Sequence, residues 1–165
     1  MFVFLIAYRI SRYARRDPSS ECLFVTSLFF SQVDNEKLGL DTVERWFKGL
    51  NIFQKKYIFV PINDSLHWTL IVIINPGLLG SRHSNSDEIS CILFLNSLKT
   101  NKKVLSRYCN LIRAWLNNEW LRINKKGVSG NLPTEDIFTE ENMPVYVPKG
   151  RLIDDIFYYQ YYFSY

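Results

Sequence analysis

Cysteine is scarce in this sequence, and the little there is forms no recognisable pattern. Cys22, Cys91 and Cys109 are an odd number, and no two of them have the CxxC spacing. This argues against both a disulfide framework and a zinc site. We expect no metal ion and no cofactor, and a reducing, intracellular compartment is the default location.

Long hydrophobic runs and a strong charge of one sign are also missing. The apolar opening Met1–Tyr8 follows no basic residue and ends at Arg9, so it is too short to span a bilayer and lacks the start of a signal peptide. The net charge is only +4, and the basic residues occur in small scattered groups without interleaved aromatic residues. These groups indicate a solvated surface, so we expect neither a membrane nor a nucleic acid as partner.

What is present is typical of one globular domain. The chain has 165 residues, of which 47% are hydrophobic and 22% are charged, enough to bury a sizeable core. A first helix is expected over residues 1–14, with a strand as the alternative, and a turn follows at 17–20. A second, centrally buried helix is expected over Cys22–Val33, with Ser20 as its cap. A third, Asp41–Lys48, has Asp41 as cap, Glu44 at the capping-box position and Gly49 at its end.

The pattern then changes to strands. Tyr57–Ile62 and His67–Ile74 are separated by a turn-like segment, which predicts a hairpin. The run from Leu70 to Ile74 is continuously apolar, as expected of a strand covered on both faces. Residues 75–77 end it, 80–88 form a polar loop, and Ile89–Leu95 is the third strand.

A long helix, Lys102–Leu121, is expected next. Its apolar residues repeat at helical spacing, whereas Arg107, Arg113, Asn117 and Asn118 lie mostly away from that face. Residues 123–142 are interpreted as a polar linker or insertion, and Met143–Val147 as a short strand. The order of helices, strands and helix predicts an α+β fold with a small central mixed sheet flanked by helices.

Two polar residues among these strands suggest cysteine-protease chemistry. A thiol protease needs a base for the thiol, a group that orients the base, and a donor for the oxyanion. His67 begins a buried strand, sharing a face with Thr69 and Ile71, while Trp68 points the other way. Asn96 ends the neighbouring strand, where its amide can reach an imidazole. A histidine in such a place is more often structural, so these residues alone leave the question open.

The surrounding sequence resembles a known family. Residues 58–73, with the words Val60-Pro61-Ile62-Asn63 and His67-Trp68, are similar to the histidine segment of the ubiquitin-like-protein-specific (SUMO) cysteine proteases, and most so to plant-like members. Residues 91–98 resemble the next motif of that family, ILxLDSL, with Asn96 at the aspartate. Residues 45–53 and 21–30 resemble the segment before the histidine strand and the central helix, so the resemblance covers about residues 1–149.

The resemblance implies a papain-like α+β fold and a cysteine-type peptidase that cleaves after the Gly-Gly of SUMO precursors or conjugates. In that case His67 is the general base, Asn96 is its orienter, and Trp68 is a wall of the tunnel that holds the substrate tail. The implied partner is SUMO or another ubiquitin-like protein and its conjugates. We expect a monomer in the nucleus or cytoplasm.

The C-terminal part departs from the family. Counting from Val147-Pro148, the glutamine that serves the oxyanion falls on Gly150 and the nucleophilic cysteine on Ile156, so neither group is expected here. The three cysteines elsewhere are better interpreted as small hydrophobic residues. Residues 1–149 are therefore expected to be a partial protease domain, and 150–165 a divergent aromatic tail from a translated intron or a frameshift.

Three functions remain open on this basis. The first is a SUMO-protease family member that is inactive as written. The second is a module that binds SUMO without cleaving it. The third is a remnant of a gene whose product has no stable fold.

Overall fold

The fold centres on a mixed sheet of five strands, seen in a computed structural model that describes residues 21–35, 39–64, 66–80, 88–96, 98, 101–124 and 136–148. The strands lie in chain order and run β1 (Cys22–Phe24), β2 (Tyr57–Asp64), β3 (His67–Ile74), β4 (Cys91–Asn96) and β5 (Val145–Tyr146). Both outer pairs, β1 with β2 and β4 with β5, are parallel, and the two inner pairs are antiparallel. The predicted α+β class and mixed sheet are confirmed.

The predicted hairpin is the centre of the sheet. Strands β2 and β3 pair from Tyr57 with Ile74 to Asp64 with His67, and β3 continues the pairing with β4. The connection between Asp64 and His67 is two residues long, and the second, Leu66, has a left-handed backbone with a φ of 65°. His67 therefore follows the turn directly and occupies the first position of its strand.

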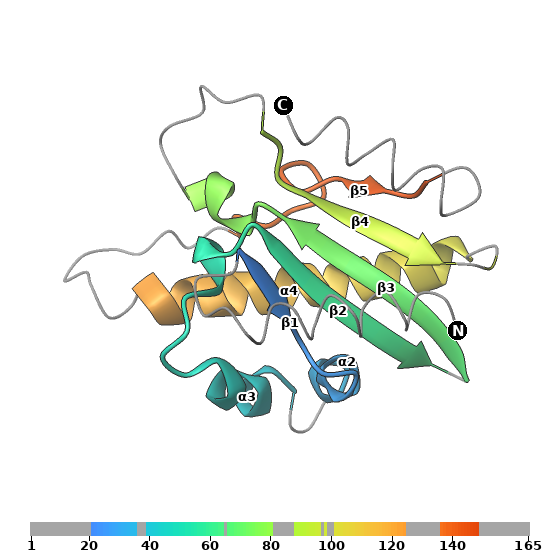
Figure 1. Ribbon diagram of the computed structural model, residues 1–165, viewed down its shortest axis with the longest axis horizontal. Coiled ribbons are helices and arrows are strands. Elements are labelled where there is room, and N and C mark those ends of the chain that lie inside the picture. Colours follow the sequence, from blue (N-terminus) through green and yellow to red (C-terminus); the bar gives the residue numbers. More distant parts are fainter. Residues whose placement is uncertain are drawn as a thin grey trace.

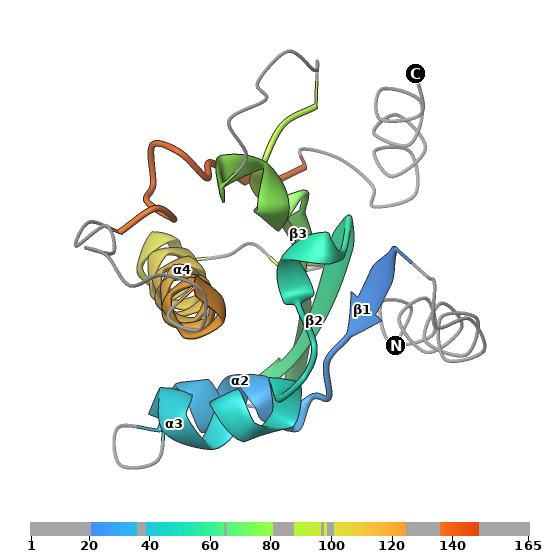
Figure 2. The same cartoon turned by 90° about the vertical axis from the view of Figure 1, so that its left-hand side faces the viewer.

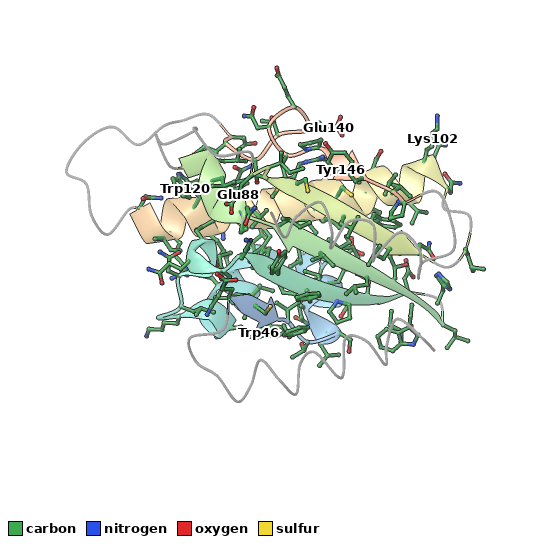
Figure 3. The ribbon with its side chains drawn as sticks, turned by 45° about the horizontal axis from the view of Figure 1, so that its top comes forward. Trp46, Glu88, Lys102, Trp120, Glu140 and Tyr146 are labelled. Carbon is green, nitrogen blue, oxygen red and sulfur yellow. The ribbon has the colours of Figure 1, made fainter. Side chains whose placement is uncertain are left out.

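One face of the sheet is covered by helices. The longest, α4 (Lys102–Asn124), lies along that face, and α2 (Leu28–Val33) and α3 (Gly39–Glu44) lie together beside it (Figures 1 and 2). Short 3₁₀ turns complete the described helices at Arg45–Phe47, Ile52–Gln54 and Pro76–Gly80. Trp46 and Glu140 mark opposite sides of the molecule in Figure 3.

The main core lies between the sheet and these helices. Trp115 of α4 is fully buried, and its ring meets Phe29 of α2 edge-on at 4.7 Å and Phe47 at 5.2 Å. Alternate residues of β3, such as Ile71 and Ile73, face this core. The residues between them, Leu70, Val72 and Ile74, belong to a second buried cluster on the other face of the sheet, so β3 is covered on both faces as predicted.

The prediction of one buried helix over Cys22–Val33 is wrong in its first half. Cys22–Phe24 is a strand that pairs in parallel with Tyr57–Phe59, and only Leu28–Val33 is helical. The rings of Phe24 and Phe59 stack with centroids 4.4 Å apart. The free edge of β2 offers this segment backbone hydrogen bonds and an aromatic partner, and tertiary pairing of this kind overrides a local helical pattern. The cap proposed at Ser20 lies outside the described residues.

The third predicted helix is shorter and starts earlier than expected. Helix α3 spans Gly39–Glu44, so Asp41 lies in its first turn and is not the N-cap. The chain continues as a 3₁₀ turn over Arg45–Phe47, and Gly49 follows with a φ of 85°. Gly49 thus supplies the left-handed conformation expected where this helical segment ends.

The long helix is confirmed, but two of its polar residues were misplaced. Helix α4 ends at Asn124, three residues beyond the predicted end, and Tyr108, Ile112, Trp115 and Leu116 are buried as expected. Arg113 and Asn117, predicted to lie away from the apolar face, are buried too. They are buried because residues 136–143, a segment distant in sequence, pack against α4. Backbone carbonyl groups of this segment accept hydrogen bonds from both side chains.

That segment is part of the fold and not only a linker. Phe138 is buried against Phe53 and Trp120, and Asn117 accepts hydrogen bonds from the backbone N–H groups of Ile137 and Phe138. It leads into β5, which confirms the predicted short strand at Met143–Val147. Within the linker predicted at 123–142, residues 125–135 lie outside the described part of the chain.

Some predictions fall on segments that the structure does not describe. These are the helix over residues 1–14, the turn at 17–20, most of the loop at 80–88, and the tail with Gly150 and Ile156. Among the residues that are described, no helix is both long and apolar enough to cross a membrane.

Candidate active site

The candidate site lies at one end of the sheet. The end of β2, the start of β3, the end of β4 and the start of α4 all meet there (Figure 1). His67 opens β3 and Asn96 closes β4, and both are half-buried. Because β3 and β4 run antiparallel, these opposite ends of neighbouring strands come together.

The structure places His67 and Asn96 in direct contact. The Nε2 atom of His67 lies 2.5 Å from the Oδ1 atom of Asn96, although 29 residues separate them. Asn96 is in register with Thr69, two residues along β3 from His67. Residues at alternate positions share a face, so His67, Thr69 and Asn96 lie on the same side of the sheet, towards α4.

The orientation of the Asn96 amide is fixed by a second hydrogen bond. The backbone N–H of Leu98 donates to the same Oδ1 atom at 3.0 Å, which identifies that atom as the oxygen and not the amide nitrogen. An oxygen acceptor requires a donor at Nε2 of His67. The neutral imidazole therefore carries its proton on Nε2 and has its lone pair on Nδ1.

This arrangement is chemically suited to a general base. An imidazole held through one nitrogen presents the other in a fixed direction to accept a proton. A neutral amide orients the ring as a carboxylate does, but it stabilises the imidazolium less because it carries no charge. The contact predicted from the two strand ends is thus present, and Trp68 lies half-buried on the opposite face of β3.

A polar cluster that the sequence did not predict lies beside the histidine. The hydroxyl of Tyr108 in α4 donates to Oδ2 of Asp64 at 2.5 Å, and Arg107 forms ion pairs with Asp34 and, at 3.8 Å, with Asp64. Burial, together with the hydrogen bond to Asp64, raises the pKa of Tyr108 to about 12, so its hydroxyl stays protonated at neutral pH. Asp64 follows the apolar run of β2 in a turn-like segment. The sequence pattern there predicts only a turn and gives no indication of a contact with α4.

Two of the three cysteines, Cys91 and Cys109, are poorly suited to attack a substrate. Cys91 and Cys109 are each only 1% exposed, and burial raises the pKa of both thiols to about 11. Cys91 packs with Leu70 and Leu95 on the face of the sheet opposite Asn96, as its spacing predicted. Cys22 lies in the edge strand β1, half-buried. Nucleophilic cysteines need a stabilised thiolate and access, and Cys91 and Cys109 have neither.

No group of three or more histidine, cysteine, aspartate or glutamate side chains in the described ranges is arranged to hold a metal ion. Gly150 and Ile156, the positions expected to replace the oxyanion glutamine and the nucleophile, lie outside the described residues.

Comparison with known proteins gives a consistent result at the level of sequence. The model of the Ulp1 protease family, C-terminal catalytic domain, matches residues 2–144. Among curated proteins of Arabidopsis thaliana, probable ubiquitin-like-specific protease 2A is 40% identical over 79 residues, which cover 47% of this chain and 10% of that protein. Ubiquitin-like-specific protease 1D is 29% identical over 129 residues, which cover 72% of this chain and 20% of that protein.

Solved structures show the same fold at low identity. A crystal structure of a de-sumoylating protease aligns with a TM-score of 0.61 at 20% identity, covering 92% of this chain and 54% of the other. The SUMO protease Ulp1 with its catalytic cysteine oxidised to a sulfinic acid aligns with a TM-score of 0.51 at 18% identity, covering 84% and 52%. The chain thus spans about half of each of these structures and a tenth to a fifth of the two curated relatives.

Proposed function

Because the chain belongs to the Ulp1 protease family, we propose that it carries the base-bearing part of a cysteine-type peptidase for ubiquitin-like proteins such as SUMO. In this proposal His67 is the general base and Asn96 orients it. The observation that carries the proposal is the 2.5 Å contact between His67 Nε2 and Asn96 Oδ1, with Leu98 fixing the amide oxygen.

We propose further that the chain as written does not cleave its substrate. The family resemblance aligns Gly150 with the oxyanion glutamine and Ile156 with the nucleophile, and neither residue has the required side-chain chemistry. The high pKa values of Cys91 and Cys109 argue against a substitute among them. Residues 1–149 would then be a partial protease domain and 150–165 a tail foreign to it.

Incubation with a SUMO precursor and with an isopeptide-linked SUMO conjugate tests the proposal. We expect no cleavage of either, while a family member that contains the glutamine and the cysteine cleaves both under the same conditions. Cleavage that is lost in His67→Ala would overturn the claim of inactivity. Cleavage that persists in His67→Ala would point to a contaminating protease.

A second candidate function is binding of SUMO without cleavage. It is favoured by Trp68, the residue that the resemblance assigns to the wall of the substrate tunnel. Trp68 follows His67 in β3 and is half-buried on the opposite face of the sheet. Calorimetric titration with mature SUMO tests it. Saturable binding that weakens in Trp68→Ala supports the binding module, and the absence of heat from a cooperatively folded protein rejects it.

A chain without a stable fold is the third alternative. The two buried clusters on either side of the sheet support a folded domain. A single cooperative thermal transition is expected, and a sloping, non-cooperative melt would favour the remnant.

A further inference from the structure

The polar cluster next to His67 joins α4 to the end of β2 and to the end of α2. Tyr108 belongs to α4, Asp64 ends β2, and Arg107 links Asp64 to Asp34, the residue after α2. Asp64 is also the register partner of His67 across the hairpin. Directly opposed residues of an antiparallel pair project from the same face with Cβ atoms about 5 Å apart. The carboxylate that Tyr108 binds therefore belongs to the residue directly opposite His67 in the hairpin.

Tyr108 also touches the strand that carries Asn96. Its ring lies 6.4 Å from that of Phe94, two residues before Asn96 on the same face of β4, and 4.7 Å from that of Phe30 in α2. The side chain is only 4% exposed, so its position is fixed by packing. Through its hydroxyl it holds the strand end next to His67, and through its ring it packs against the strand end next to Asn96.

Both partners of the His67–Asn96 contact lie where strands are least restrained. His67 is the first residue of β3 and Asn96 the last of β4. The turn before His67 adds little restraint, since Leu66 is 98% exposed and adopts a left-handed backbone that is unfavourable for a branched side chain. Strand ends of this kind open locally unless another element secures them.

We propose that Tyr108 is a positioning residue that acts through Asp64: it ties the end of the hairpin to α4 and so keeps His67 Nε2 on Asn96 Oδ1. The proposal rests on the proposed function, in which His67 is the base. Arg107 assists by holding Asp64 towards Asp34, and its guanidinium lies 5.7 Å from the centre of the Tyr108 ring. Asp64 is half-exposed, and the hydrogen bond from Tyr108 and the ion pair with Arg107 both restrict its position.

The tautomer of His67 and the exchange rate of its Nε2 proton measure how firmly the imidazole is held on Asn96. The chain has two histidines, so His83→Gln leaves His67 as the only imidazole in a long-range ¹H–¹⁵N NMR spectrum. In that background we expect the Nε2–H tautomer to dominate and its proton to exchange slowly with water. In Tyr108→Phe, which keeps the buried ring and removes only the hydroxyl, we expect a mixture of tautomers. The Nε2 proton should exchange about tenfold faster, because a hydrogen bond to a charged acceptor shifts an equilibrium by at least that factor.

Tyr57→Phe is the matched control. Tyr57 begins β2 at the opposite end of the hairpin, where it pairs with Ile74, and its loss of a hydroxyl should leave the His67 signals unchanged. Asp64→Ala removes the acceptor at a half-exposed site without touching the core under α4, and it should reproduce Tyr108→Phe. If Tyr108→Phe fails to fold, Asp64→Ala alone tests the role of the Tyr108–Asp64 hydrogen bond.

Asn96→Ala separates failure of this inference from failure of the proposed function. If Asn96→Ala changes the tautomer and Asp64→Ala and Tyr108→Phe do not, the positioning role is wrong and the base–orienter pair stands. If Asn96→Ala also leaves the tautomer unchanged, the proposed pair itself is wrong. A lower melting temperature in Tyr108→Phe with an unchanged imidazole would show a purely structural role and overturn the inference.

Discussion

Arg113 donates a hydrogen bond from Nη2 to the carbonyl oxygen of Met143 at 2.9 Å, joining the middle of α4 to the residue two positions before β5. Nη1 of the same guanidinium lies 3.6 Å from Glu140 and donates to Asn110 within the helix. The next backbone contact, from the N–H of Ile92 to the carbonyl of Pro144, begins the pairing of β5 with β4. Arg113 thus connects α4 to the segment that leads into the fifth strand.

Substitution of Arg113 should therefore loosen that strand. In Arg113→Met we expect the free energy of unfolding to fall by about 1–3 kcal/mol, because the buried carbonyl of Met143 loses its charged donor. Urea denaturation measures the loss, and amide hydrogen exchange should show reduced protection at Ile92. Lys103→Met, at an exposed position of the same helix, is the control and should change stability by less than about 0.5 kcal/mol. Equal stability of the two variants would contradict this role.

Glu119 predicts a pH dependence of stability. Its side chain is fully buried beside Arg122, which also donates to the carbonyls of Phe47 and Leu50. Burial raises the pKa of Glu119 above its usual range, and Arg122 opposes the shift. The folded state then holds this proton more tightly than the unfolded state. The stabilisation is present below the unfolded pKa and is lost as the pH rises through the folded pKa.

We therefore expect the native protein to gain stability relative to Glu119→Gln as the pH falls from neutral to about 4, near the unperturbed pKa of glutamate. Urea denaturation of both proteins across that range gives the difference directly. Glu141→Gln, at an exposed position, should show no such trend relative to the native protein. If the native protein instead loses stability relative to Glu119→Gln as the pH falls, Arg122 dominates and the sign is reversed.

The buried thiols should be nearly inert. With a pKa near 11, Cys91 and Cys109 carry a thiolate fraction at pH 8 that is lower by roughly two orders of magnitude than that of an unperturbed cysteine. Iodoacetamide should therefore modify both at least about 100-fold more slowly in the native protein than in the urea-unfolded chain. Peptide mapping by mass spectrometry gives the rate at each site. Modification of either cysteine at the unfolded rate would contradict its burial and make that thiol a candidate nucleophile.

The predictable parts of this fold are those whose partners lie nearby in sequence. The β2–β3 hairpin follows from two apolar runs and a short turn, and α4 follows from apolar residues at helical spacing. The His67–Asn96 contact could also be predicted from the sequence, because it requires only that two apolar strands with polar ends be neighbours. These elements bring His67 and Asn96 together, and the family resemblance is what suggests their roles as base and orienter.

The parts that escaped prediction depend on distant partners. Cys22–Phe24 becomes a strand only because the edge of β2 is available to it, and Arg113 and Asn117 are buried only because 136–143 returns to α4. The Tyr108–Asp64 bond joins residues 44 positions apart, and neither end carries a local signal. Periodicity identifies which face of a helix is apolar, but it does not reveal which polar residues a later segment will cover.

In the proposed function, the base and its orienter are present while the nucleophile is not. Intact-mass spectrometry after incubation with a SUMO probe that ends in an electrophile at the Gly-Gly tail tests this most directly, because an adduct requires a thiol beside His67. We expect no adduct with the native chain, and the same result with His67→Ala. An adduct that maps to one cysteine of the native chain and disappears in His67→Ala would contradict the claim.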